Sequence, residues 1–262
     1  MVFEHFFQLL GVGPYTALFL VAGSAVAGFI DSLCGGGGLI SIPVLLMGGF
    51  TPAQAIAANK LQGTLGAVAS THYYFGKGVL DIGVLCKIGG GAAVGGLLGT
   101  IAVNRIGNHF MAKIMPVMLI AMAVYFAFSS GVGDKEHKPR MALSAVAASL
   151  IPLIGFYDGF FGPGAGTFYL ACLISVAGFA VTRAMAYSRI LNLISNAASL
   201  ILFVVLGKMV WGAGIAMSLG EVMGVYAGSR LVHKHGARLV RPLVVIACVV
   251  MAIKSLRDGM GA

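Results

Sequence analysis

The chain has 262 residues, of which 59% are hydrophobic and only 10% charged, and its formal net charge is +9. Soluble domains carry about 25% charged residues, so this polar surface is too small to cover a water-soluble particle. The composition excludes an ordinary soluble domain and favours a membrane protein. At about 20 apolar residues for each span, plus short turns, the chain accommodates about eight spans.

Apolar stretches, taken in chain order, predict an all-α polytopic membrane protein. Residues 1–10 lack the basic start of a signal peptide, so the first stretch is expected to remain as a span. The predicted spans are 14–33, 52–75, 79–103, 111–129, 141–160, 181–206, 210–229 and 239–257. The stretches 35–48 and 162–177 are apolar and glycine-rich but too short to cross, so each is predicted to be a re-entrant or broken-helix segment.

One series of motifs occurs twice. Gly28-Phe29-Ile30-Asp31 returns as Gly155-Phe156-Tyr157-Asp158, and a glycine-rich stretch follows each copy. Ten residues after a Gly-Phe pair stands Lys60 in the first copy and Arg189 in the second. Offsets of 127, 129 and 131 residues relate the matched motifs, so only short insertions separate the copies. A repeated order of this kind indicates a duplicated unit.

The duplication predicts two tandem repeats of four spans each, which are parallel because four is an even number. The first transmembrane repeat covers 1–130, the polar linker 131–140 and the second transmembrane repeat 141–262. Basic loops at 105–113 and 230–241 fall on the same predicted side, and the positive-inside rule makes that side cytoplasmic. Both termini are then predicted to lie on the periplasmic side. The linker carries Lys135, Lys138 and Arg140, so the two sides are nearly balanced.

Ionisable residues within spans are costly and are therefore candidates for function. Asp31 and Asp158 end the first span of each repeat, and Lys60 and Arg189 occupy matched positions in the span after the break. In a structural interpretation, each aspartate caps a half-helix or pairs with its basic partner and so holds the break together. In a functional one, the basic pair attracts an anion and an aspartate exchanges a proton. The two interpretations are compatible. Mid-span Glu221 is either a third proton-coupling candidate or part of a local salt bridge.

The glycine-rich breaks favour an anion as the solute. A broken helix at membrane depth leaves free N–H groups, which must face protein or a water-lined cavity. The N-terminus of the following half-helix carries partial positive charge, and glycines let a solute reach the backbone. Two such breaks predict one anion site between the repeats. The predicted substrate-binding residues are Gly35, Gly36, Gly37, Gly38, Asn59, Lys60, Gly162, Gly164, Ser188, Arg189, Asn192 and Asn196.

Polar side chains form a stripe on the span that carries Arg189. Its members at helical spacing are Ser188, Asn192, Ser195, Asn196 and Ser199, and the matching span offers Asn59, Gln62, Thr64 and Ser70. Any single member can be explained by a hydrogen bond between helices. The stripe as a whole is better explained as the lining of a solute path.

Other classes of function find no support in the sequence. The four cysteines show no CxxC or Cys/His spacing, so neither a metal nor a disulfide framework is expected. There is no nucleophile elbow, Walker loop or HExxH motif, so we expect neither an enzyme nor a cofactor. No basic soluble segment is interleaved with aromatic residues, so nucleic acid is not an expected partner. The expected partners are a small anionic solute and the lipid bilayer.

The chain resembles the TauE/SafE family, also called the 4-toluene sulfonate uptake permease family, over essentially its whole length. The motifs that carry the resemblance are Gly28–Asp31 with Gly35–Leu39, Ile42-Pro43, residues 58–62 and residues 155–166. The resemblance implies a multi-pass permease of the bacterial inner membrane with a duplicated four-plus-four helical fold. Relatives in this family are linked to export or uptake of sulfite, sulfonates and related organosulfur anions.

The sequence therefore predicts a secondary transporter for a small anion, such as sulfite, a sulfonate or a related organosulfur compound, with the proton as a candidate coupling ion. A passive anion channel is the alternative within transport. From another class, the alternative is a membrane sensor or assembly partner that carries no flux. Substrate identity, direction of transport and oligomeric state stay open at this stage.

Overall fold

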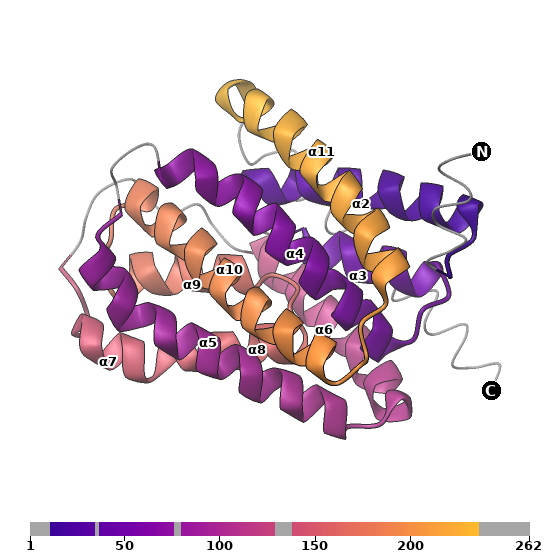
Figure 1. Ribbon diagram of the computed structural model, residues 1–262. Coiled ribbons are helices and arrows are strands. Elements are labelled where there is room, and N and C mark those ends of the chain that lie inside the picture. The colour runs from indigo at the N-terminus through magenta and orange to yellow at the C-terminus, as the bar shows by residue number, and fades with distance from the viewer. Residues whose placement is uncertain (1–10, 35–36, 76–79, 129–137, 236–262) are drawn as a thin grey trace.

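The computed structural model describes residues 11–34, 37–75, 80–128 and 138–235, and in these residues it is built of helices without strands (Figure 1). The helices before the linker are α2 (Pro14–Cys34), α3 (Gly38–Met47), α4 (Pro52–Phe75), α5 (Ile82–Arg105) and α6 (Asn108–Phe128). Those after it are α7 (Leu143–Ala148), α8 (Leu150–Phe160), α9 (Ala165–Ser175), α10 (Val181–Val205) and α11 (Trp211–His235).

Each predicted span that lies in the described residues is helical, which confirms the all-α prediction; the span at 239–257 lies outside them. Helix α11 continues to His235, so the start of the predicted basic loop 230–241 is helical instead. Four described segments are long and apolar enough to cross a membrane: Pro14–Ser32, Ile82–Arg105, Leu143–Phe160 and Val181–Val205. The tandem duplication and the re-entrant course of α3 and α9 remain predictions.

The helix ends follow local chemistry. Thr51 and Gln54 form a capping box before α4: the Thr51 N–H donates to Gln54 Oε1 at 3.0 Å, and the Gln54 N–H donates to Thr51 Oγ1 at 3.4 Å. Asp81 caps α5 by accepting from the Gly83 N–H at 2.7 Å. The predicted span 141–160 is divided at Ser149, because the ring of Pro152 clashes with the carbonyl four residues earlier.

Helices from opposite sides of the linker cross at glycines. Helix α2 packs on α11, and α5 packs on α8. A Cβ at Gly224 of α11 would lie 2.0 Å from the Ala25 carbonyl oxygen, and one at Gly159 of α8 would lie 2.0 Å from the Gly96 carbonyl oxygen. Such close approach needs residues without side chains, as is common where membrane helices cross. The segments before and after the linker are therefore interleaved, and α4 also packs on α10 and α11.

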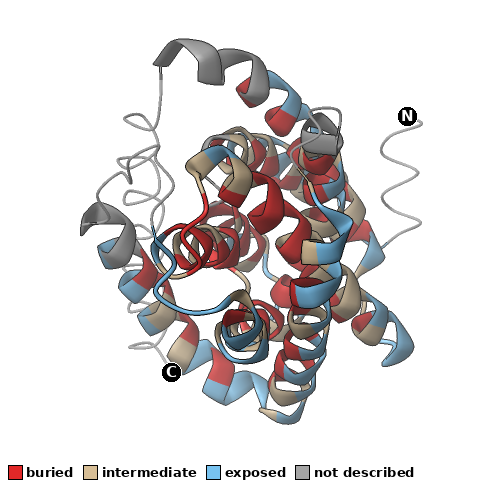
Figure 2. Ribbon diagram, turned by 90° about the vertical axis from the view of Figure 1, so that its left-hand side faces the viewer, coloured by how far each residue is buried: buried red, intermediate tan, exposed pale blue. Residues whose placement is uncertain are grey.

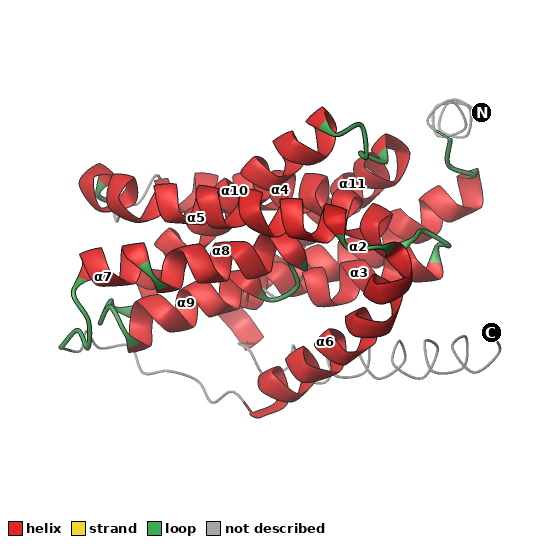
Figure 3. Ribbon diagram, turned by 90° about the horizontal axis from the view of Figure 1, so that it is seen from below, coloured by secondary structure: helices red, strands yellow, loops and turns green. Residues whose placement is uncertain are grey.

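Burial is arranged as expected for a helical bundle in lipid. Buried residues face the middle of the bundle, and exposed residues face outward (Figure 2). Large apolar side chains such as Leu18, Leu153 and Ile201 are more than half exposed on the outside. Polar and charged side chains, including Lys60, Asp158 and Glu221, are buried inside. Helix α6 lies at the periphery of the bundle (Figure 3). Charged and polar side chains therefore lie in the interior of the bundle, away from its lipid-facing surface.

Candidate functional site

The two glycine-rich breaks meet in the interior. The second break runs from the end of α8 at Phe160 to the start of α9 at Ala165, and its Gly162 and Gly164 have φ values of +100° and +80°. The Tyr157 hydroxyl donates to the Pro163 carbonyl oxygen at 2.6 Å and holds this turn. A Cβ on Gly38, the first residue of α3, would lie 3.0 Å from Pro163 Cα. The starts of α3 and α9 thus lie close together.

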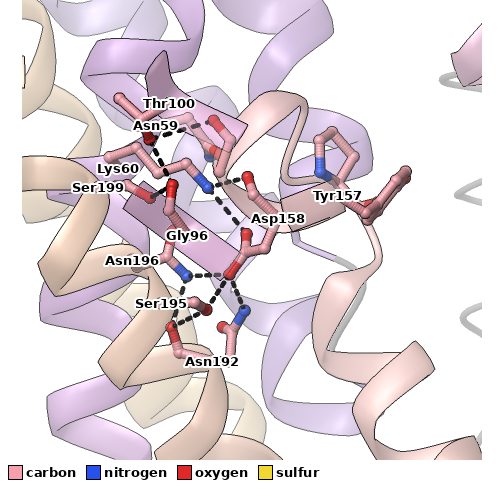
Figure 4. A network of polar contacts seen from close by, with 12 residues as sticks. Asn59, Lys60, Gly96, Thr100, Tyr157, Asp158, Asn192, Ser195, Asn196 and Ser199 are labelled. Atoms are coloured by element: carbon pink, nitrogen blue, oxygen red, sulfur yellow. Dashed lines mark hydrogen bonds and ion pairs between the residues drawn. The ribbon is translucent and has the colours of Figure 1, made fainter. Parts of the chain in front are cut away.

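The Asp158 cluster consists of Asp158, Lys60, Asn192, Ser195 and Asn196 (Figure 4). Lys60 Nζ donates to Asp158 Oδ1 at 2.8 Å and also to the Asp158 carbonyl oxygen. The other carboxylate oxygen accepts from the Ser195 hydroxyl and from the side-chain amides of Asn192, at 3.2 Å, and Asn196, at 3.4 Å. The Lys60 and Asp158 side chains are 0% and 1% exposed. Both carboxylate oxygens are therefore fully engaged.

The Asp31 cluster consists of Asp31, Arg189 and Gly37. Arg189 donates from NH1 to Asp31 Oδ2 at 2.7 Å and from NH2 to the Asp31 carbonyl oxygen. The Gly37 N–H donates to Asp31 Oδ1 at 3.2 Å. The side chains are 7% and 18% exposed, so this pair is more open than that of Lys60 and Asp158. In both clusters the base comes from one side of the linker and the acid from the other.

The Glu221 network consists of Glu221, Gln62, Ser41 and Asn59. Gln62 Nε2 donates to Glu221 Oε2 at 2.7 Å and to Ser41 Oγ at 2.6 Å. Gln62 Oε1 accepts from Asn59 Nδ2 at 3.2 Å, and the Ser41 hydroxyl donates to the Gly37 carbonyl oxygen at 3.1 Å. The network links α11 through α4 to the first break.

A pocket lies between the clusters. Its lining comprises Asp31, Gly38, Asn59, Gln62, Gly63, Asp158, Gly162, Gly164, Ala165, Gly166, Asn192, Asn196 and Glu221. The cavity volume is about 40 Å³, counted as the space open to the centre of a water molecule. One buried water needs about 10–15 Å³ by this measure, so the pocket has room for a few waters or one small solute. No group of three or more metal-ligating His, Cys, Asp or Glu side chains occurs in the described part of the chain.

Most residues singled out from the sequence meet at this pocket. Gly38, Asn59, Gly162, Gly164, Asn192, Asn196 and the carboxylates of Asp31, Asp158 and Glu221 line it. Lys60 and Arg189 do not line it, since each is turned onto an aspartate. Ser188 does not line it either, because its hydroxyl donates to the Met185 carbonyl oxygen of its own helix at 2.9 Å. Gly37 bonds Asp31, and Gly35 and Gly36 lie outside the described residues.

Gln62 and Ser41 were not among the predicted substrate-binding residues. Gln62 stands in the polar stripe of α4, three residues after Asn59, and this spacing was the available signal. Ser41 lies in an apolar helix and carries no such signal. The local salt bridge considered for Glu221 is not formed with either base of the site, because Lys60 bonds Asp158 and Arg189 bonds Asp31.

The sequence matches one family of membrane transporters. A family model described as "Sulfite exporter TauE/SafE" matches residues 20–255. A "Probable membrane transporter protein ORF9" of a Sinorhizobium species is 37% identical over 240 residues, which cover 92% of each chain. "Probable membrane transporter protein YfcA" of Escherichia coli K12 is 37% identical over 260 residues, or 98% of this chain and 96% of the relative.

A "Probable membrane transporter protein" of Haemophilus influenzae is 36% identical over 249 residues, covering 95% of this chain and 97% of its own. No solved structure matches the chain. The family model spans most of the chain, the relatives align over nearly their full lengths, and the apolar helices are those of a multi-pass membrane protein. The chain belongs to the TauE/SafE family of membrane transporters.

Proposed function

We propose that the protein is a secondary transporter of the bacterial inner membrane for a small organosulfur anion such as sulfite or a sulfonate. One observation carries the proposal: two glycine-rich breaks, each followed by a short helix, meet at one polar pocket in an otherwise apolar bundle. Helices α3 and α9 begin at this pocket, so the backbone N–H groups of their first turns lie beside it. Helix N-termini favour a bound anion through those donors and the helix dipole.

The pocket's chemistry supports an oxyanion as the solute. Asn59 and Asn192 each donate one amide N–H within the site and have a second one for a solute oxygen, whereas Asn196 uses both on Asp158 and the Asn192 carbonyl oxygen. Gly164 and Gly166, which carry no side chains, also line the pocket. The room for a few waters fits a group of the size of sulfite or the head of a sulfonate. The same arrangement supports the two tandem repeats, since each would supply one break, one aspartate and one base to a single shared site.

Flux in reconstituted vesicles tests the proposal. Purified protein in liposomes is given radiolabelled sulfite or methanesulfonate, with nitrate and chloride as competing anions. We expect uptake that saturates and counterflow driven by unlabelled substrate, both lowered in Arg189→Gln. Arg183→Gln is the matched control, because Arg183 lies on the same helix but stacks on the Phe179 ring at 4.5 Å.

Three results would count against the proposal. Flux without saturation or counterflow would favour a passive channel. The absence of flux for each anion would favour a protein that transports nothing. Flux unchanged in Arg189→Gln would mean that the pair of Arg189 and Asp31 does not act on the solute.

A further inference from the structure

The charges around the pocket, with every group ionised, are unfavourable for a bound anion. Three carboxylates line it: Asp31, Asp158 and Glu221. The two bases bonded to these groups are Lys60 and Arg189, and each is occupied by an aspartate. With every group ionised, these five residues carry a net charge of −1, and a bound monoanion would raise it to −2. A low-dielectric interior penalises such an excess strongly.

The three carboxylates differ in what protonation would cost. Both oxygens of Asp158 accept from Lys60, Ser195 and the side-chain amides, and both oxygens of Asp31 accept from Arg189 and the Gly37 N–H. All of these are donors. A proton on either aspartate would meet a donor and would break a buried ion pair, which costs about 3–5 kcal/mol when one partner is lost.

Glu221 is different because its neighbour can serve either state. Its carboxylate accepts a hydrogen bond from Gln62, whose side chain carries both an N–H donor and a carbonyl acceptor. The amide can donate to the ionised carboxylate and, after rotating, accept from the protonated one. Rotation would turn Gln62 Nε2 towards Asn59 Nδ2, so the Asn59 amide must rotate as well, and the Ser41 hydroxyl would then donate to Gln62 Oε1 in place of the Gly37 carbonyl oxygen. Lysine and arginine, with donors alone, have no such second arrangement.

The surroundings of Glu221 also isolate it. It is 3% exposed, and its carboxyl lies over Gly66 of α4, where a Cβ would be 3.0 Å from Oε1. Its backbone lies against α2, where a Cβ on Gly28 would be 2.3 Å from the Glu221 carbonyl oxygen. Among the described residues, the charged groups that act on it are Asp31 of α2 and Arg189 of α10, which are already paired with each other. α4 presents Gln62, and through it Ser41 of α3.

We infer that Glu221 takes up one proton from water when the anion enters the pocket and releases it when the anion leaves, while Asp31 and Asp158 stay ionised. The inference rests on the proposed anion transport. The step balances: one anion and one proton enter, no bond to the anion forms, and the charge of the site is unchanged. The predicted cycle is therefore electroneutral, with one proton for each monovalent anion.

Methanesulfonate is the decisive probe, because its acid group stays ionised and cannot itself carry the proton. In wild-type vesicles a gradient of one pH unit should drive about tenfold accumulation for one proton per anion, accompanied by acidification of a trapped pH dye. Glu221→Gln, which resembles the protonated state, should keep the exchange of labelled for unlabelled methanesulfonate but lose both accumulation and acidification. Ser218→Ala is the matched control on the same helix, since Ser218 is buried and bonds the Gly214 carbonyl oxygen of that helix at 2.7 Å.

Accumulation that persists in Glu221→Gln, or that follows a sodium gradient instead of the pH gradient, would overturn the inference and leave the proposed function standing. Absence of exchange in the wild-type protein would overturn the proposed sulfonate transport instead. A second measurement needs no variant. Dicyclohexylcarbodiimide reacts with protonated carboxyls in apolar surroundings, and peptide mapping should find it on Glu221, more with saturating methanesulfonate than without it and less at higher pH. A label on Asp31 or Asp158 in place of Glu221 would contradict the inference.

Discussion

The Asp158 cluster and the Asp31 cluster hold similar ion pairs in different surroundings. Lys60 and Asp158 are closed off from solvent, at 0% and 1% exposure, and hydroxyl and amide donors complete the shell of Asp158. Arg189 and Asp31 are 7% and 18% exposed, and a backbone N–H is the further donor to Asp31. We propose that the two pairs have different roles: the closed pair ties α4 to α8, and the open pair acts on the solute.

Removal of Lys60 should have the largest effect on stability. Lys60→Met leaves the Asp158 carboxylate buried without its cation, which costs about 3–5 kcal/mol. Arg189→Met should cost less, because Asp31 is partly exposed to water. Thermal unfolding of the detergent-solubilised variants measures the difference.

Rescue provides the control for that comparison. Adding Asp158→Asn to Lys60→Met removes the uncompensated charge and should recover much of the lost stability. Equal losses in Lys60→Met and Arg189→Met would contradict the division between a closed and an open pair. So would a double variant no more stable than Lys60→Met alone.

Gly162→Ala should have the next largest effect, because it strains the break beside the closed pair. Gly162 has a φ of +100°, and a Cβ there would lie 3.1 Å from Lys60 Nζ. A left-handed conformation costs a residue other than glycine about 1–2 kcal/mol, and displacement of Lys60 adds to this. In the described part of the first break, Gly37 has a φ of −53° and makes no such demand.

Gly207→Ala separates the two costs. Gly207 also has a positive φ, +64°, but nothing lies within 4 Å of a Cβ built on it. We expect Gly162→Ala to lower the midpoint of thermal unfolding more than Gly207→Ala does. Equal shifts would mean that backbone strain alone accounts for the effect and that Lys60 adjusts without cost.

Repetition in the sequence predicted the four members of the two ion pairs but not which acid pairs with which base. Asp31, Asp158, Lys60 and Arg189 stand out because charges in apolar spans are rare and these recur at matched positions. Lys60 is 98 residues from Asp158, and Arg189 is 158 residues from Asp31. That choice depends on how α4 and α10 cross the helices from the other side of the linker, and no local pattern encodes it.

Local rules explain what the sequence missed around these pairs. Ser188 belongs to the polar stripe, yet a serine within a helix commonly bonds its own backbone, and Ser188 does so. Glu221 lies 159 residues from Gln62, so its partner could not be found by spacing. The helices themselves were predictable, because apolar length and breaking residues act locally, as the division at Ser149 before Pro152 illustrates.

Ser195→Ala tests what completes the closed pair. Ser195 donates to the Asp158 carboxylate oxygen that Lys60 does not bind. Hydrogen bonds between membrane helices reach at most about 1.7 kcal/mol, and a charged acceptor favours the upper end, so we expect a loss of about 1.5 kcal/mol. Ser199→Ala, one turn further along α10, removes a bond to the neutral Gly96 carbonyl oxygen and should cost less. A larger loss for Ser199→Ala would contradict the role given to Ser195.

Ser41→Ala should have the smallest effect, because it acts on the open side through a neutral hydroxyl. Ser41 accepts from Gln62 and donates to the Gly37 carbonyl oxygen, so it ties the Glu221 network to the first break. Neutral hydrogen bonds between membrane helices contribute about 0.6 kcal/mol on average, so the midpoint of thermal unfolding should move little and by less than in Ser195→Ala.

The pH dependence of methanesulfonate flux should shift clearly in Ser41→Ala, because Gln62 would lose one of the bonds that fix its amide. Ser218→Ala, which removes a bond within one helix, should leave that pH dependence as in the wild-type protein. The opposite result would be a Ser41→Ala variant that is as unstable as Ser195→Ala and whose flux keeps the wild-type pH dependence. The surroundings of Asp31 would then serve stability as much as those of Asp158 do, and the two pairs would not differ in role.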